Sequence, residues 1–309
     1  MDSAQVDAYL RRLGAERPPR PTAEALGALH LRHLRTVPFE NLSVHLGEEI
    51  VLAETPLHDK VVGRGRGGFC YELNGLFGAL LTALGYRVTM LAARVYGDGG
   101  RVGIPYDHMA LLVRTEEGGD WLADVGFGAH SHGPLAVGER ADQEDGGGTF
   151  RVVESGPDAA GVRGGGGVRG GDGARGGDGA RGGDGVAKAS GPAPAADLDV
   201  LRDGKQVYRV EARPRVLDDF VSGAWWHSTS PRSHFLQSTV CSRVTGDGGR
   251  ITLSGRRLTS TATGGGREER ELETDAEVLA AYREHFGIRL DRVPVRRQDD
   301  TGPQAGTRP

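Results

Sequence analysis

The sequence has few of the features that mark secreted, membrane-spanning or disulfide-bonded proteins. Only two of its 309 residues are cysteines, Cys70 and Cys241. No apolar run approaches the roughly 20 residues that cross a bilayer, and the first residues, MDSAQ, lack the basic and apolar regions of a signal peptide. These absences predict a cytoplasmic protein, in which a reducing environment keeps both cysteines as free thiols.

The chain also lacks a block of charge of one sign. It carries 38 Lys and Arg against 42 Asp and Glu, a formal net charge of −4. Nucleic acids and anionic membranes attract concentrated positive charge, so neither is expected as a partner. A content of 37% hydrophobic residues suits a globular protein of two or three subdomains. The composition therefore favours a small-molecule ligand.

One segment lacks the residues that build a core. From about residue 155 to 196 there is no aromatic residue, leucine or isoleucine, and residues 169–185 repeat the motif RGGDGA. Such a tract cannot bury enough apolar surface to offset its ordering entropy, which predicts a disordered insertion. A calcium-binding solenoid would need a nine-residue period with an inward apolar residue. A phosphate loop would need a strand before it and a helix after it. The tract has none of these features, so neither a calcium site nor a phosphate loop is expected here.

The rest of the chain shows clear periodicity. Apolar residues at helical spacing predict helices over residues 3–13 and 22–35, the second capped by Thr22. Another helix is predicted over residues 275–286, with Asp275 as its cap and Gly287 behind it. Short β-branched or alternating runs predict strands that form a sheet or small barrel, at residues 87–96, 107–114, 121–125, 149–153, 207–213, 235–244 and 250–253.

Cys70 is the most informative residue. It lies in the run RGGFCYELN (residues 66–74), where a glycine-rich turn leads into an apolar helix that ends at Gly85. Unpaired N–H groups and the positive end of the helix dipole favour a thiolate at a helix start. Cys70 is thus a candidate nucleophile. The alternative is a buried structural cysteine that acts as a small hydrophobe.

A cysteine nucleophile needs a base and a group that orients the base. His108 opens the apolar run at 107–113, and Asp124 lies inside another, WLADVGFG, at residues 121–128. A charged carboxylate buried without a partner is costly. If the two strands are adjacent, Asp124 orients His108, and His108 serves Cys70 as general base and acid. The other early histidines, His30, His33, His45 and His58, are expected to be surface or satisfied side chains.

Five motifs in order give the chain a family resemblance. They are VPFENL (37–42), RGGFCYELN (66–74), DHM (107–109), DVGFG (124–128) and STSP (228–231) followed by Phe235. The chain resembles arylamine N-acetyltransferases over about residues 1–150 and 200–290. This resemblance implies an α+β fold: an N-terminal helical bundle (1–85), a β-barrel (86–213) with the insertion, and a C-terminal α/β lid (214–295) before a flexible tail (296–309).

The resemblance also implies roles for single residues. A papain-like Cys-His-Asp triad maps onto Cys70, His108 and Asp124. Coenzyme A is expected in a cleft between the turn after Asp124 and the lid. The remaining implied site residues are a structural ion pair, Arg66 with Glu40; an acceptor pocket of Phe39, Phe69 and Phe127; and cofactor contacts at Gly126, Phe127, Gly128, Ser228 and Thr229.

The implied reaction is ping-pong transfer of an acetyl group from acetyl-CoA, through acetyl-Cys70, to the nitrogen of an arylamine or arylhydrazine, as in xenobiotic metabolism. Acetyl-CoA is then a co-substrate, and no permanently bound cofactor or metal is expected. Whether the protein forms a homodimer is left open. The alternatives are an amide synthase that releases a polyketide as a macrolactam with the same triad, a cysteine peptidase or transglutaminase-like enzyme, and a non-catalytic binding module.

Overall fold

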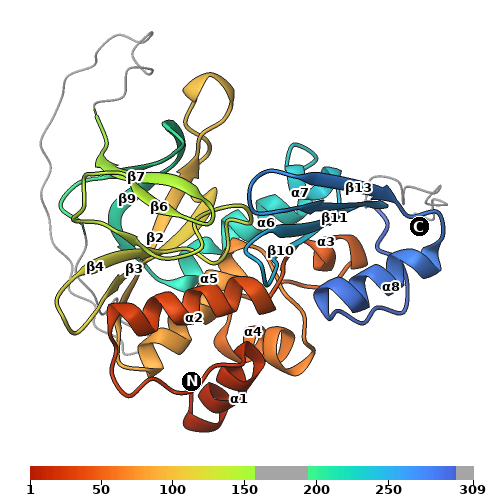
Figure 1. Ribbon diagram of the computed structural model, residues 1–309, viewed down its shortest axis with the longest axis horizontal. Helices are drawn as coiled ribbons and strands as arrows, with labels where there is room; N and C mark the ends of the chain where they lie inside the picture. Colours follow the sequence, from red (N-terminus) through yellow and green to blue (C-terminus); the bar gives the residue numbers. More distant parts are fainter. Residues whose placement is uncertain (157–193, 297–309) are drawn as a thin grey trace, which may run out of the picture.

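The computed structural model describes residues 1–156 and 194–296. The glycine-rich repeats and nearly all of the tail predicted at 296–309 lie outside these ranges. The described residues form three parts that meet around α5 (Cys70–Ala83): N-terminal helices, a curled antiparallel sheet, and a C-terminal sheet covered by a helix (Figure 1). This is the predicted α+β architecture. No helix within the described ranges is long and apolar enough to cross a bilayer.

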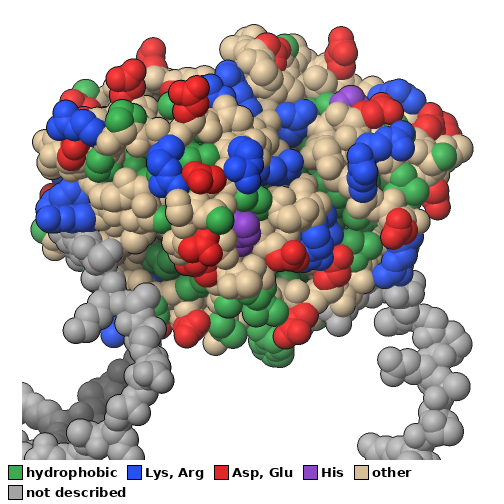
Figure 2. All heavy atoms as spheres, turned by 90° about the horizontal axis from the view of Figure 1, so that it is seen from below, with side chains coloured by type: hydrophobic (Ala, Val, Ile, Leu, Met, Phe, Trp, Pro, Cys, Tyr) green, Lys and Arg blue, Asp and Glu red, His purple; other side chains and the backbone are tan. Residues whose placement is uncertain are grey.

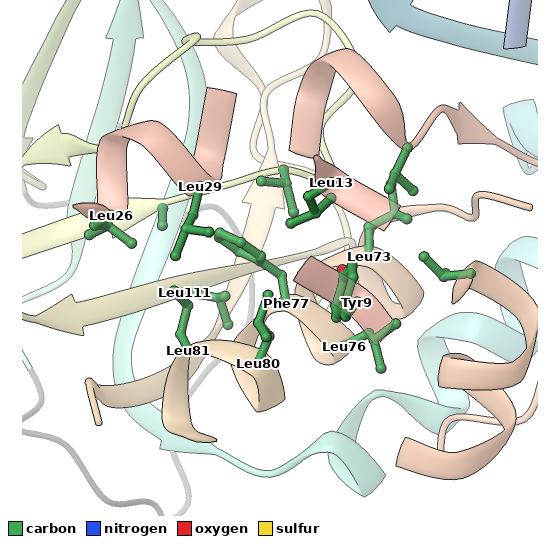
Figure 3. Close-up of a cluster of buried hydrophobic side chains, with 14 of the residues drawn as sticks. Tyr9, Leu13, Leu26, Leu29, Leu73, Leu76, Phe77, Leu80, Leu81 and Leu111 are labelled. Carbon is green, nitrogen blue, oxygen red and sulfur yellow. The ribbon is translucent and has the colours of Figure 1, made fainter. Parts of the chain in front are cut away.

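The N-terminal part packs its helices around α5. It contains α1 (Ser3–Leu13), α2 (Ala23–Thr36), α3 (Leu42–Leu46), α4 (Glu54–His58) and a π-helical turn, Asp59–Gly63. The Thr22 side chain caps α2 as predicted, accepting a hydrogen bond from the N–H of Ala25. Figure 3 shows leucines of α1 and α2 meeting Phe77 and its neighbours on α5, with Leu111 of the sheet beside them. Apolar residues on most faces of α5 make it the centre of this core.

Eight described strands form a nearly closed antiparallel barrel in the order β5-β4-β3-β2-β9-β8-β7-β6. The Gln143 side chain exchanges two hydrogen bonds with the backbone of Ala136 and so joins the edge strands β6 and β5. A short 3₁₀ turn, Asp98–Gly100, follows β2. The strands are β2 (Arg87–Val95), β3 (His108–Arg114), β4 (Asp120–Ala123), β5 (Leu135–Ala136), β6 (Gln143–Asp145), β7 (Gly148–Glu154), β8 (Leu198–Arg202) and β9 (Lys205–Arg215).

The third part begins with the 3₁₀ turn Leu217–Phe220, α6 (Val221–Thr229) and α7 (His234–Gln237). A five-stranded sheet follows, in the order β1-β10-β11-β12-β13 within the described residues, with α8 (Asp275–Phe286) packed on it. Its first strand, β1 (Phe39–Glu40), comes from the N-terminal part and pairs with β10. This sheet therefore joins the C-terminal part to the N-terminal part, which carries Cys70. The other strands are β10 (Val240–Val244), β11 (Arg250–Ser254), β12 (Arg257–Thr261) and β13 (Arg267–Glu271).

Three local predictions are wrong. The strand predicted at 235–244 starts only at Val240, because Ser233 accepts a hydrogen bond from the N–H of Phe235 and begins a short helix there. The cap of α8 is Thr274 rather than Asp275, since the Thr274 hydroxyl accepts from the N–H of Glu277. Asp124 follows the end of β4 instead of lying inside a strand. Side-chain hydrogen bonds to the backbone decide the first two cases.

Charges are mixed over the surface in view. Figure 2 shows Lys and Arg interspersed with Asp and Glu over one face of the molecule, with hydrophobic side chains between them. On this face the structure agrees with the absence of a single-sign charge block in the sequence.

Candidate active site

The loop before α5 delivers Cys70 to the first position of the helix, where its side chain is buried. Two glycines make this path possible. A Cβ on Gly67 would collide with the carbonyl of Pro38, and one on Gly68 would lie 2.6 Å from a carboxylate oxygen of Glu72. The glycines of the motif therefore serve close packing of the loop under the nucleophile.

A buried ion pair anchors the start of this loop. Arg66 Nε donates to Glu40 Oε1 at 2.9 Å, and both side chains are at most 5% exposed. The Glu40 carboxylate also accepts hydrogen bonds from the N–H groups of Leu42 and Gly67. Burial opposes ionisation of Glu40, but the charges of Lys60 and Arg66 outweigh it and hold the pKa of Glu40 below its ordinary value. The pair implied by the family resemblance is thus present.

A second buried pair, which sequence reasoning missed, lies beside the first. Lys60 Nζ contacts Glu72 Oε1 at 2.6 Å, with both side chains at most 7% exposed. The other oxygen of Glu72 accepts from the N–H of Phe69, the residue before Cys70. Lys60 reaches inward from the π-helical turn. No sequence signal marked Lys60, whereas Glu72 could have been suspected from its place inside an apolar helix.

His108 and Asp124 form a buried pair. β3 and β4 are adjacent, with Leu111 opposite Ala123, so the start of β3 and the end of β4 lie at the same edge. There His108 Nε2 contacts Asp124 Oδ2 at 2.7 Å, with side chains 4% and 1% exposed. This geometry leaves Nδ1 as the imidazole nitrogen free to serve the thiol. Strand adjacency, which the sequence could only assume, is what brings the two residues together.

The electrostatics favour a charged pair. Burial alone would lower the pKa of His108, but the Asp124 carboxylate and the nearby Cys70 thiol raise it to about 10. Burial also disfavours the Asp124 carboxylate, and the His108 charge outweighs it and lowers the pKa of Asp124 well below its ordinary value. Because the pKa of His108 lies above neutrality, its imidazole is an imidazolium at pH 7.

The turn after Asp124 lies directly on the nucleophile. A Cβ on Gly126 would be 2.7 Å from the Cα of Cys70, so only glycine fits here. Cys70, His108, Gly126 and Phe127 line one pocket of about 370 Å³. The three predicted triad residues therefore share one site.

Asn74 joins the nucleophile helix to the His108–Asp124 pair. It lies one turn after Cys70 on the same face of α5. Its Nδ2 donates to Asp124 Oδ1 at 2.9 Å and to the carbonyl of Met109 at 2.7 Å, while its Oδ1 accepts from the N–H of Val125 at 2.9 Å. Sequence reasoning assigned it no role. A polar residue four positions after a nucleophile, within an apolar helix, was the available signal.

We expect Asn74→Ala to lower kcat/KM for the reaction at Cys70 by about 10- to 100-fold, because small misplacements of reacting groups are costly. The matched control is Thr82→Ala on the same helix, whose hydroxyl only bonds the carbonyl of Gly78. Steady-state kinetics together with circular dichroism of both variants provide the measurement. Equal activities in the two variants would remove the positioning role of Asn74.

The His30 imidazole makes a hydrogen bond with the backbone of Asp124. Its Nε2 accepts from the backbone N–H of Asp124 at 3.2 Å, and its Nδ1 lies 3.0 Å from the carbonyl of His132. Both ring nitrogens are thus satisfied in the neutral form with the proton on Nδ1, and burial lowers the pKa of His30. His30 matches the expectation of a satisfied side chain, yet it is fully buried beside the site.

The other predicted contacts are placed as follows. Phe39 and Phe127 line the pocket of Cys70, whereas Phe69 is buried behind it and packs edge-on against Phe235. Gly128, at φ +91°, packs on the Phe39 ring. Ser228 and Thr229 line a neighbouring cavity, and their hydroxyls donate to α6 carbonyls. These two residues are not brought to the nucleophile, because the helix directs them to its other side.

Comparisons with known proteins agree with this site. A family model described as N-acetyltransferase matches residues 22–295. The arylamine N-acetyltransferase of Escherichia coli K12 is 30% identical over 294 residues, 92% of each chain. The solved enzyme from Salmonella typhimurium superposes with a TM-score of 0.75 at 29% identity, covering 93% of this chain and 92% of the other.

A third relative was solved with a ligand. The Mycobacterium marinum arylamine N-acetyltransferase, solved in complex with CoA, is 28% identical, covers 92% of each chain and has a TM-score of 0.72. The family match spans nearly all of the described residues and contains every residue of the site. The chain belongs to the arylamine N-acetyltransferase family of enzymes.

Proposed function

We propose that the protein transfers an acetyl group from acetyl-CoA to the nitrogen of an arylamine or arylhydrazine through an acetyl-Cys70 intermediate. The observation that carries this proposal is the pocket shared by Cys70, at a helix start, and His108, whose Nε2 lies 2.7 Å from Oδ2 of the buried Asp124. The CoA complex of the mycobacterial relative supports CoA as the carrier of the acyl group.

In the first half-reaction the Cys70 thiolate attacks the thioester carbonyl of acetyl-CoA. The His108 imidazolium then gives its proton to the departing CoA sulfur, which leaves as the thiol, and His108 becomes neutral. We expect backbone N–H groups at the start of α5 to supply donors for the oxyanion of the tetrahedral intermediate. Asp124 holds the imidazole through Nε2 throughout.

In the second half-reaction the amine nitrogen attacks the acetyl-cysteine carbonyl. Neutral His108 takes the proton from that nitrogen, the carbon–sulfur bond breaks, and Cys70 departs as a thiolate beside the re-formed imidazolium. The cycle needs neither a metal nor an oxidant, since each proton that His108 gives up is recovered. It predicts ping-pong kinetics.

Mixing the protein with acetyl-CoA alone is expected to add one acetyl group, which peptide mass spectrometry should locate on Cys70. Cys70→Ala should show no adduct. Cys241→Ala is the matched control: Cys241 is buried in the C-terminal sheet, and the variant should keep the adduct on Cys70. Adding an arylamine should remove the adduct. Formation of N-acetylated product by a protein that never carries the adduct would contradict the covalent step.

The size of the pocket favours a small acceptor over a polyketide. A volume of about 370 Å³ lies at the lower end of the range for drug-sized ligands. A macrolactam-forming amide synthase has to hold a long acyl chain beside its cysteine. We therefore expect loading of Cys70 to slow as the acyl-CoA chain lengthens.

A further inference from the structure

His130 is a buried histidine near the His108–Asp124 pair, and the mechanism described above gives it no part. It lies in the connection between β4 and β5 and is 4% exposed. Its Nε2 lies 3.2 Å from the hydroxyl oxygen of Tyr208, a residue of β9. Its Nδ1 is buried and has no hydrogen-bond partner within the part of the chain that the structure describes. Buried polar atoms are nearly always paired, so this unpaired nitrogen calls for an explanation.

Tyr208 connects His130 to the Asp124 carboxylate. The Tyr208 side chain is fully buried, and its ring centroid lies 5.3 Å from that of His108. Its hydroxyl makes a hydrogen bond with the Asp124 carboxylate. Burial, together with the charge of Asp124 and this hydrogen bond, raises the pKa of Tyr208 well above its ordinary value. Tyr208 is therefore a neutral phenol whose hydroxyl lies between an imidazole nitrogen and a carboxylate.

The positions of the protons follow from counting donors and acceptors. The Tyr208 hydroxyl has one proton, and a hydrogen bond to a charged acceptor is stronger than one to a neutral acceptor, so the proton is directed at Asp124. The Tyr208 oxygen then accepts from His130, which places the proton of the neutral imidazole on Nε2. Nδ1 is left as an acceptor, and it is the nitrogen that lacks a partner. One arrangement of protons thus accounts for both hydrogen bonds and for the unpaired nitrogen.

The surroundings of His130 keep its imidazole neutral. Three aromatic rings pack against it at centroid distances of 5.0 to 5.3 Å, those of Phe127, Phe150 and Tyr208. Burial lowers the pKa of His130 to about 4, although the charge of Asp124 acts to raise it. The other groups that act on its charge, all of which lower its pKa further, are His108, His30 and Arg202. A neutral imidazole has a single N–H, and here Tyr208 receives it.

We propose that His130 is a positioning residue for the reaction at Cys70: its Nε2–H donates to the Tyr208 oxygen and keeps the Tyr208 proton directed at Asp124. The proposal rests on the proposed function, because it assigns a further residue to that reaction. A hydroxyl that also accepts a hydrogen bond is a stronger donor, and a fixed hydroxyl restrains the carboxylate that orients the His108 imidazole. His130 is not among the residues that line the pocket of Cys70, so it acts through these neighbours.

The experiment removes the donor and the hydroxyl separately and together. The variants are His130→Leu, which has no N–H; His130→Gln, whose amide keeps one; Tyr208→Phe; and the double variant His130→Leu/Tyr208→Phe. If His130→Leu does not fold, His130→Phe replaces it, since a phenyl ring suits aromatic surroundings and also lacks an N–H. His33→Leu is the matched control, because Nε2 of His33 lies 2.8 Å from the hydroxyl of Tyr9 in another fully buried pair. The measurements are kcat/KM for acetyl transfer, the rate of Cys70 alkylation by iodoacetamide against pH, and stability in urea.

We expect His130→Leu to lower kcat/KM by about 3- to 10-fold, the range for one neutral hydrogen bond, and His130→Gln to keep most of the wild-type value. In the Tyr208→Phe background the change to Leu should cost less than about twofold, because the oxygen that His130 serves is gone. His33→Leu should lose stability and keep its kcat/KM. Equal losses in the Leu and Gln variants, or losses that multiply in the double variant, would overturn the proposal and leave His130 a packing role.

Failure of the proposed function has a different signature. If the wild-type protein never forms acetyl-Cys70, the acetyltransferase proposal fails, but iodoacetamide still reports the reactivity of the thiol. The pH profile of alkylation should move in the same direction in His130→Leu and Tyr208→Phe, and stay at the wild-type position in His130→Gln and His33→Leu. A His130→Leu profile that coincides with that of the wild type would contradict the positioning role whatever the reaction.

Discussion

Asp124→Asn is expected to lower kcat/KM for acetyl transfer by on the order of 10³- to 10⁴-fold in a protein that remains folded. The amide has nearly the shape of the carboxylate but cannot stabilise the imidazolium charge of His108. It can also donate to Nε2 and thereby select the wrong tautomer. The contact at 2.7 Å joins side chains that are at most 4% exposed, so solvent does little to compensate for the lost charge.

The same variant should change the pH dependence of Cys70. The Asp124 charge is the main influence that raises the pKa of His108 to about 10 against burial, which lowers it. Without that charge burial prevails, and His108 loses its proton at a lower pH. The imidazolium that accompanies the thiolate should then be lost at a lower pH than in the wild type. Rates of Cys70 alkylation by iodoacetamide, measured against pH, test this.

Asp120→Asn provides the matched control. Asp120 lies four residues earlier, on β4, in a partly exposed pair with Arg114, and the change should leave both the rate and the alkylation profile near those of the wild type. An Asp124→Asn variant with the same profile as this control would show that Asp124 does not set the charge of His108.

Arg66→Met is expected to reduce the free energy of unfolding by about 3–5 kcal/mol, the range for breaking a buried ion pair by removing one partner. Glu40 is fully buried and would keep its charge with only Lys60 nearby. The loop that carries Cys70 would lose its anchor as well, so activity should fall with stability. Urea denaturation followed by tryptophan fluorescence gives the value.

Two further variants make this test specific. Arg114→Met removes a pair whose side chains are about one-third exposed, and its cost should be no more than about 1 kcal/mol. Adding Glu40→Gln to Arg66→Met removes the stranded charge and should recover part of the lost stability. If both single arginine variants cost the same, the buried pair is no more important than a surface pair.

The sequence predicted those helices that are marked by their own apolar spacing and by the residues at their ends. The bounds of α1 and α8 follow from apolar spacing and from turn residues that end each helix in the left-handed conformation, Gly14 and Gly287. The start of α5 at Cys70 follows from the glycines before it and the leucines after it. Prediction was wrong where a side chain competes for the backbone, as Ser233 and Thr274 do.

In the candidate site too, some residues could be identified from the sequence and others could not. Cys70, His108 and Asp124 could be selected from sequence because each places a reactive group in or beside an apolar element. Asn74 and Lys60 could not be assigned roles in this way, because their partners, Asp124 and Glu72, lie 50 and 12 residues away along the chain. Ser228 and Thr229 were chosen by resemblance, and the helical turn of α6 places them in the neighbouring cavity.

The sequence by itself determined the bounds of α1 and α8, the family and the three candidate catalytic residues, because these depend on the chemistry and spacing of neighbours along the chain. Only the tertiary structure decided that β3 lies beside β4, that Asn74 joins the two sides of the site, and that Gly126 packs against Cys70. Those contacts join residues that are far apart in the chain. Long-range packing brings them together, and no local propensity encodes it.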